Sequence, residues 1–203
     1  MTFIPAKIFS GSGLVTLDFE AYTGEGEAPA LVFEEGVREG WYDYFGVFNG
    51  CSSLTSVSLP ARLVSVPKYA FMDCSNLETV TFEEGSSFTV IGEYAFQNCH
   101  ALTSVEFPES LREIGEYAFY YCDSLTTIAL PEGLTTIGGD AFEYCSSLES
   151  VYIPASVTSV GACAFYGTYG TIYVAFSEAE ADERCDYGWS GYNATVVYDY
   201  TKD

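Results

Sequence analysis

The sequence predicts a solenoid of stacked repeats, in which short strands from successive units form a parallel sheet. Three observations support this prediction. Cysteines recur at a nearly constant interval of about 23 residues, a leucine lies three residues after each of them, and an Ala-Phe pair occurs once in each unit. The cysteines are Cys51, Cys74, Cys99, Cys122 and Cys145, and the pairs end in Phe71, Phe96, Phe119, Phe142 and Phe165.

Each unit begins with a short strand. After the leucine, a β-branched residue and a large apolar residue alternate with small or polar ones, as in Val57-Ser58-Leu59. This period of two turns one face inward and the other outward. A proline, which lacks a donor N–H, then ends the strand in four of five units. These prolines are Pro60, Pro108, Pro131 and Pro154, and Glu83 takes their place in the remaining unit.

The second half of each unit carries an apolar pair three residues apart, as in Leu111 and Ile114, followed by a glycine and the Ala-Phe pair. The stretch between the glycine and the next cysteine is too short for a long helix, so we predict a single helical or 3₁₀ turn there. A unit has no second layer to cover its inward side chains. Neighbouring units must therefore cover them.

The unit resembles the BspA-like leucine-rich repeat, and residues 122–144 carry the resemblance most clearly, reading CDSLTTIALPEGLTTIGGDAFEY. The resemblance extends over about residues 47–176. It implies a leucine-rich-repeat solenoid of mostly short strands and turns, a right-handed curved stack with a parallel sheet on the concave face. Departures from the pattern are Glu83 for proline, Pro67 for glycine and Thr168 where a sixth cysteine would fall.

The chain reads as a single solenoid domain over residues 1–203 with three parts. Residues 1–46 contain only degenerate repeats, in which Leu14 and Leu17 keep part of the strand pattern, and they are predicted to form an N-terminal cap. Residues 47–176 hold the regular repeats. Residues 177–203 are predicted to form a C-terminal cap, because the last strand of a stack exposes an unpaired edge.

The charge balance excludes several classes of partner. Seven Lys and Arg residues face 29 Asp and Glu residues, which gives a formal net charge of −22. Binding to phosphates and to anionic lipids needs basic residues, so we expect neither a nucleic-acid partner nor adsorption to such lipids. No apolar run is long enough for a membrane helix. The apolar start is broken at Pro5 and Lys7, too soon for a signal peptide.

The five recurring cysteines occupy one structural position, so we predict buried, reduced thiols that act as small apolar groups. The spacing of neighbouring coils exceeds the Cβ separation of a disulfide. Cys163 and Cys185 lie outside the series, and the sequence leaves open whether they pair. A Cys-x-x-Cys motif is absent. We therefore expect no cofactor and no metal.

The sequence predicts no enzyme. His100 follows Cys99, but the same position in the other units holds serine or aspartate, so His100 is read as a solvated substitution in a polar turn. A glycosidase needs two carboxylates in a cleft. The acids fall mostly at loop positions, such as Glu83, Glu84, Glu109 and Glu132, where solvation is the simpler reading. A carbohydrate-active enzyme or carbohydrate-binding module is kept as a minor alternative.

Outward side chains are the remaining candidates for function. Tyr152 and Tyr173 fall on adjacent predicted strands, Glu106 points outward on an earlier one, and a second group lies beside the Ala-Phe pairs, at Tyr120, Tyr121 and Tyr144. Tyrosine is enriched at interfaces, although these rings would equally serve to cover the solenoid. The resemblance implies an adhesion module of a bacterial surface or secreted protein, with an extracellular partner such as a host matrix protein. We expect the chain to be a monomer. A structural spacer is the alternative.

Overall fold

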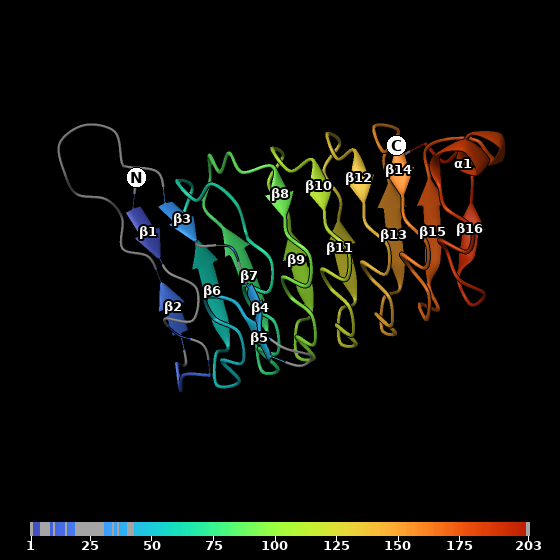
Figure 1. Cartoon of the computed structure of the whole chain (residues 1–203). Coiled ribbons are helices and arrows are strands. Elements are labelled where there is room, and N and C mark those ends of the chain that lie inside the picture. Colours follow the sequence, from blue (N-terminus) through green and yellow to red (C-terminus); the bar gives the residue numbers. More distant parts are fainter. Residues whose placement is uncertain are drawn as a thin grey trace.

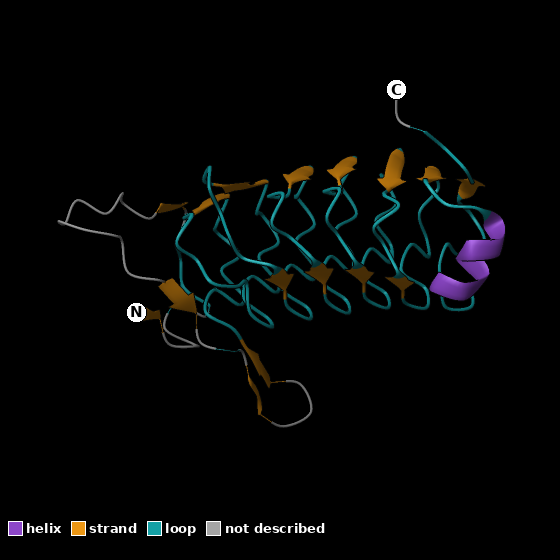
Figure 2. Cartoon of the chain, turned by 90° about the horizontal axis from the view of Figure 1, so that it is seen from above, coloured by secondary structure: helices purple, strands orange, loops and turns teal. Residues whose placement is uncertain are grey.

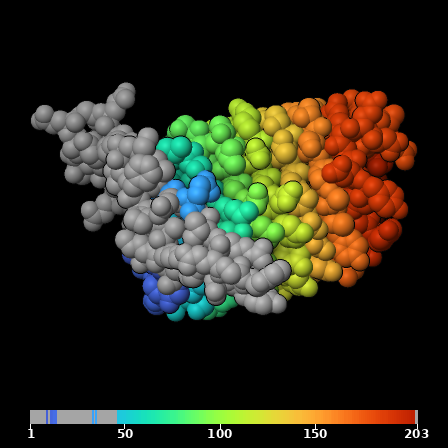
Figure 3. Space-filling view, viewed as in Figure 1, coloured from blue at the N-terminus to red at the C-terminus, as the bar shows by residue number. Residues whose placement is uncertain are grey.

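The computed structural model describes residues 2–4, 9, 11–14, 16–18, 31–33, 35, 37–39 and 43–201, and the statements below concern these residues. The chain winds into successive coils that stack along one axis, and each coil corresponds to one sequence repeat (Figure 1). In the space-filling view the coils lie side by side as bands that follow the order of the sequence (Figure 3).

An eight-stranded parallel sheet runs the length of the stack. It contains β2 (Thr16–Asp18), β6 (Ser56–Leu59), β7 (Thr79–Phe82), β9 (Ser104–Glu106), β11 (Thr127–Ala129), β13 (Ser150–Ile153), β15 (Thr171–Val174) and β16 (Thr195–Val197). Equivalent residues of successive repeats are paired, as with Val57 and Val80 or Val105 and Ile128. The predicted leucine-rich-repeat solenoid with a parallel sheet is confirmed.

A second parallel sheet lies opposite the first and was not predicted from the sequence (Figure 2). Its four short strands are β8 (Val90–Ile91), β10 (Glu113–Ile114), β12 (Thr136–Ile137) and β14 (Ser159–Val160). Each strand contains the second residue of the apolar pair that marks the second half of the repeat. The sequence does not reveal these strands, because two residues are too few to show an alternation of inward and outward side chains. Each strand buries its second residue in the core between the sheets, as Ile114 does.

Tight turns replace the helical turn that we predicted before each cysteine, and that prediction was wrong. The turns contain backbone hydrogen bonds from the N–H of residue i+3 to the carbonyl of residue i, for example from Ala118 N to Gly115 O. However, Tyr117 and Tyr121 have φ values of 56° and 58°. Residues in this left-handed region cannot continue a right-handed helix. The Tyr117 N–H instead donates to the Gly139 carbonyl of the next coil, so the turns also join coil to coil.

Phenylalanine rings form the centre of the core. The ring of Phe119 stacks between those of Phe96 and Phe142, with centroids 5.1 and 5.2 Å away. The same contact continues in both directions, at 5.0 to 5.3 Å, through Phe9, Phe48, Phe71, Phe96, Phe119, Phe142 and Phe165. Stacked aromatic pairs add about 0.5–1.5 kcal/mol each to the free energy of area burial. The ladder ends where Trp189 meets Phe165 edge to face.

The five recurring cysteines form a second ladder beside the phenylalanines. Each thiol is buried, and each donates to the carbonyl of a phenylalanine in the preceding coil, as from Cys122 Sγ to Phe96 O at 3.2 Å. Burial raises the pKa of Cys122 well above its ordinary value. The predicted buried, reduced thiols are confirmed. Cys163 and Cys185 are also free, so the pairing that the sequence left open is not formed.

Successive coils approach closely where the repeat carries glycine. A Cβ added to Gly115 would lie 2.7 Å from the backbone nitrogen of Glu93, and one added to Gly138 would lie 2.5 Å from that of Glu116. No side chain fits between the backbones at this distance, which explains why glycine recurs at this position. These glycines directly follow strands of the second sheet, so the close backbone contact lies beside that sheet.

Helix α1 (Glu178–Arg184) closes the C-terminal end of the stack (Figure 1). Ser177 and Glu180 form a capping box at its start. The Arg184 guanidinium donates to the carbonyls of Ala155 and Val157 in the preceding coil. At the other end, β1 (Thr2–Ile4) pairs with β3 (Leu31–Phe33), and β4 (Val37–Glu39) forms a hairpin with β5 (Asp43–Phe45). The division into caps at 1–46 and 177–203 stays a prediction, and much of the first lies outside the described residues.

Inward and outward positions on β11 predict opposite effects of mutation. Leu125 precedes this strand and is fully buried, whereas Thr127 on the strand is exposed. Leu125→Ala leaves a cavity between coils, so we expect it to lower the free energy of unfolding by about 2–5 kcal/mol. Thr127→Ala should change it by less than about 0.5 kcal/mol. Urea unfolding followed by circular dichroism measures both, and similar losses at the two positions would contradict the inward and outward assignment.

Candidate interaction surfaces

Glu106, Tyr152 and Tyr173 lie in one row across the outer face of the eight-stranded sheet. Glu106 is in register with Ala129 on β11, and Tyr152 is in register with Tyr173. β11 separates Glu106 from Tyr152, because the strand order is β9, β11, β13. The structure therefore places all three predicted residues on one surface, with only the two tyrosines on adjacent strands.

A third tyrosine, which the sequence analysis missed, joins this row. The ring of Tyr200 lies 4.5 Å from that of Tyr173 and 5.9 Å from that of Tyr152. The Tyr200 N–H donates to the Val174 carbonyl and so holds the tail beside β15. Burial, with the nearby charge of Glu132, raises the pKa of Tyr152. The chain's own tail thus already contacts the predicted tyrosine pair.

A hollow of about 400 Å³ lies further along the same sheet, over β7 and β9. It is lined by Thr79, Val80, Thr81, Phe82, Ser104 and Glu106. Glu106 brings the only charge among these lining residues, and a single exposed carboxylate cannot supply the acid–base pair of a glycosidase. The hollow offers hydrogen-bonding groups rather than a reaction centre.

Tyr120, Tyr121 and Tyr144 form part of a larger aromatic surface on the turns that follow the second sheet. We call this surface the tyrosine flank. Its members are Tyr94, Tyr117, Tyr120, Tyr121, Tyr144 and Tyr166, and Tyr69 and Tyr192 extend it at the two ends. Consecutive ring centroids lie 4.6 to 6.3 Å apart, from Tyr69 to Tyr192. The rings therefore form one continuous path across successive coils.

The members of the tyrosine flank are partly exposed, as Tyr121 is at 38% of its surface. Tyr94 and Tyr117 stack with their planes only 4° apart, because they occupy the same position in successive coils. The flank lies on the turns and the Glu106 row lies on the outer face of the first sheet. The six residues predicted from the sequence thus form two surfaces rather than one.

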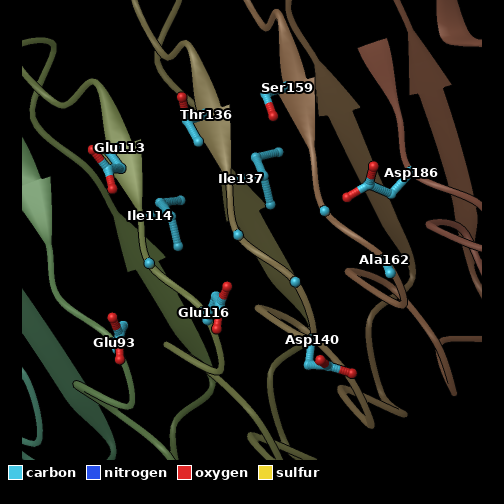
Figure 4. A pocket seen from close by; sticks show the side chains of 14 residues that line it. Glu93, Glu113, Ile114, Glu116, Thr136, Ile137, Asp140, Ser159, Ala162 and Asp186 are labelled. Atoms are coloured by element: carbon cyan, nitrogen blue, oxygen red, sulfur yellow. The ribbon is translucent and has the colours of Figure 1, made fainter. Parts of the chain in front are cut away.

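A groove of about 480 Å³ adjoins the tyrosine flank and runs along the second sheet (Figure 4). We call it the acidic groove. Its five carboxylates are those of Glu93, Glu113, Glu116, Asp140 and Asp186, and none of its lining residues is basic. In Figure 4, Glu93, Glu116 and Asp140 follow one another along one edge. An acid directly precedes both Tyr94 and Tyr117, so the acidic edge could have been predicted from the sequence.

Where the flank meets the groove, two carboxyl groups share a hydrogen bond. Burial, a hydrogen bond that protonated Glu143 donates to Asp140, and the negative charge of Asp140 raise the pKa of Glu143 to about 7. Burial and the same aspartate raise the pKa of Tyr117 to about 12. Glu143 therefore holds a proton more readily than an ordinary glutamate does, and the Tyr117 hydroxyl stays protonated at neutral pH.

His100 lies on the surface, as predicted. Its Nδ1 is 3.0 Å from Asp123 Oδ1 and both side chains are exposed, while the neighbouring Cys99 thiol is buried and bound to the Phe71 carbonyl. Cys99 and His100 thus do not form a nucleophile–base pair. Within the part of the chain that the structure describes, no three His, Cys, Asp or Glu residues are grouped so as to hold a metal ion. No helix in that part has the length and apolarity to cross a membrane.

The fold and its surfaces define a solenoid repeat protein whose partly exposed side chains are aligned from coil to coil. The model of the BspA type leucine-rich repeat region matches residues 44–171 in six copies. The chain belongs to this family. A search of curated proteins found no match.

Solved structures of bacterial leucine-rich repeat proteins are similar to this chain. A leucine-rich cell surface protein of Faecalibacterium prausnitzii is 28% identical, with a TM-score of 0.65 over 86% of this chain and 48% of its own. A leucine-rich repeat protein of T. pallidum is also 28% identical, with a TM-score of 0.57 over 74% of this chain and 78% of its own. A leucine-rich repeat protein from Eubacterium ventriosum shares the fold. It is 22% identical, with a TM-score of 0.54 over 68% of this chain and 34% of its own. The chain thus spans about half of the Faecalibacterium protein.

The raised pKa of Glu143 predicts a pH-dependent stability. Between about pH 4.5 and pH 7 the folded protein keeps a proton that the unfolded chain has lost, so the Glu143 contribution to stability decreases as the pH rises. Glu143→Gln removes this loss. We therefore expect the melting temperature of the variant, relative to wild type, to increase from about pH 5 to about pH 8.

The matched control is Glu132→Gln, which removes the same charge at an exposed loop position. Circular dichroism melts of the three proteins across this pH range give the comparison. A Glu143→Gln difference that stays constant, or that follows the Glu132→Gln difference, would contradict the raised pKa.

Proposed function

We propose that the chain is a non-catalytic protein-interaction module of a bacterial cell-surface or secreted protein, and that it binds an extracellular protein, such as a host matrix protein, through the tyrosine flank. The observation that carries this proposal is the continuous path of partly or largely exposed rings from Tyr94 to Tyr192, which begins at the buried ring of Tyr69. Tyrosine offers a large apolar area with a polar tip, and it is among the residues that contribute most to binding energy at interfaces.

The rigidity of the flank supports the proposal. The rings project from turns whose backbones are hydrogen-bonded to the next coil, as from Tyr121 N to Glu143 O at 3.0 Å. Ring-to-ring contacts further restrict the side chains, as between Tyr121 and Tyr144 at 4.6 Å. A surface ordered before binding loses little conformational entropy when a partner docks, so more of the contact energy appears as affinity.

The charge and the comparisons support the kind of partner and the location. A net charge of −22 attracts basic surfaces and makes association rates fall with salt. The similar protein of Faecalibacterium prausnitzii is described as a cell surface protein. A surface location suits a module that meets proteins of other cells or of a host.

The row of Glu106, Tyr152 and Tyr173 is a second candidate surface of the same module. The contact of Tyr200 with both rings supports this surface as a place where an aromatic side chain packs. A structural spacer is the second candidate function. The regular, rigid stack and the coverage of only 48% of the Faecalibacterium protein are the observations that favour it.

A panel of immobilised extracellular matrix proteins, probed by biolayer interferometry, tests the proposed function. We expect the wild-type chain to bind at least one protein, more weakly at high salt because the attraction is screened. Replacing two central rings, in Tyr121→Ala/Tyr144→Ala, should weaken this binding by about tenfold or more, since each removes a large contact.

Tyr152→Ala/Tyr173→Ala is the matched control, because it removes two rings from the other surface. Binding that falls only in this control would move the site to the sheet face. An absence of binding to the whole panel would favour the spacer. Melting curves of both variants show whether the stack remains folded.

A further inference from the structure

The chain contains its own example of a cation bound at the edge of the tyrosine flank. The Lys68 ammonium forms an ion pair with Glu93 and lies 5.1 Å from the ring centre of Tyr69 and 5.5 Å from that of Tyr94. Attraction of an ammonium to ring faces adds to the ion pair. Burial opposes the charge of Lys68 and is the largest single influence on its pKa, but hydrogen bonds to Glu93 and Tyr69 and the charges of both groups together raise that pKa.

One coil further, the same position has no lysine. The residue before the ring is Lys68 in one coil, Glu93 in the next and Glu116 in the one after. Glu93 and Glu116 thus follow one another at the spacing of adjacent coils, beside the stacked rings of Tyr94 and Tyr117, whose centroids are 4.8 Å apart. Lys68 pairs with Glu93, whereas among the described residues no cation forms an ion pair with Glu116.

The acidic groove extends this position and is of a size to receive side chains. Its volume of about 480 Å³ lies beside Glu93 and Glu116, and Glu113 on β10 lines it as well (Figure 4). Among the described residues, Lys68 supplies the cation contacts to the rings of the flank. The groove is therefore complementary in charge to a basic segment, and the flank supplies the ring faces that such a segment needs.

We propose that the acidic groove docks a basic segment of the partner protein. A lysine of that segment takes, beside Glu116 and Tyr117, the position that Lys68 takes beside Glu93. This inference rests on the proposed function, since it names the chemistry of the partner. The carboxylates bind the ammonium and the rings cover its aliphatic stem, as long basic side chains prefer.

A short fluorescein-labelled peptide of alternating glycine and lysine is the probe, and fluorescence anisotropy at low salt is the measurement. We expect the wild-type chain to bind it and to bind the same peptide with glutamine in place of lysine much more weakly. Glu116→Gln should weaken binding by about fivefold, the upper range for an exposed ion pair. Tyr117→Leu should weaken it by about threefold, through loss of the ring face.

Glu132→Gln, which removes an equal charge at an exposed position outside the lining of the groove, should change the affinity by less than about twofold. Lys68→Gln should increase the number of peptides bound at saturation, because it vacates the position at Glu93. Equal losses in Glu116→Gln and Glu132→Gln, or equal binding of the glutamine peptide, would overturn the proposal.

The two proposals fail separately. A chain that binds the lysine peptide at Glu116 but no matrix protein would keep the groove as a site for basic segments and would refute the proposed function. Binding to a matrix protein that is unaffected by Glu116→Gln would keep the function and refute the basic segment as its ligand.

Discussion

The stacking of Phe119 on Phe96 and Phe142, repeated in each coil, is the contact on which the other features of the structure depend. A coil of about 23 residues has too few apolar groups to form a core alone, so its inward side chains are covered by the same side chains of the next coil. This requirement fixes the register. Once the rings are stacked, the thiol of Cys122 meets the Phe96 carbonyl, and Gly115 meets the backbone of Glu93.

The same register creates the surfaces. Any outward residue that recurs in the repeat is placed beside its equivalent in the next coil, whether or not the core needs it. Aromatic residues at such a position become a path of rings, and acids become a row of like charges. Lys68 relieves that repulsion at one step by pairing with Glu93. The next step, at Glu116, carries the charge without that lysine, which is why we connect the architecture of this protein with recognition of basic groups.

The sequence predicted the repeating features that residue type marks, and it missed features that residue type does not mark, even where they recur in each coil. The first sheet, the buried cysteines and the outward position of Thr127 follow from the period alone. The second sheet was missed, because a strand as short as Glu113–Ile114 shows no alternation. The helical turn was wrongly predicted, because Tyr117 has a left-handed φ. Tyrosine rarely adopts this conformation, so the residue type gave no indication of it. Of the candidate site, the tyrosines were found, whereas Tyr200 was missed because the path of the tail has no period.

Alkylation of the native protein with iodoacetamide, read by mass spectrometry, tests the stacked coils most directly. In the structure the five ladder thiols, from Cys51 to Cys145, are buried against the preceding coil, whereas Cys163 is partly exposed. A thiol reacts as thiolate and only where the reagent reaches it. We predict that Cys163 reacts first and that the five ladder cysteines react together, only when the chain unfolds. Rapid labelling of Cys99 or Cys122 in the folded protein would contradict the stacking of coils on which every other conclusion depends.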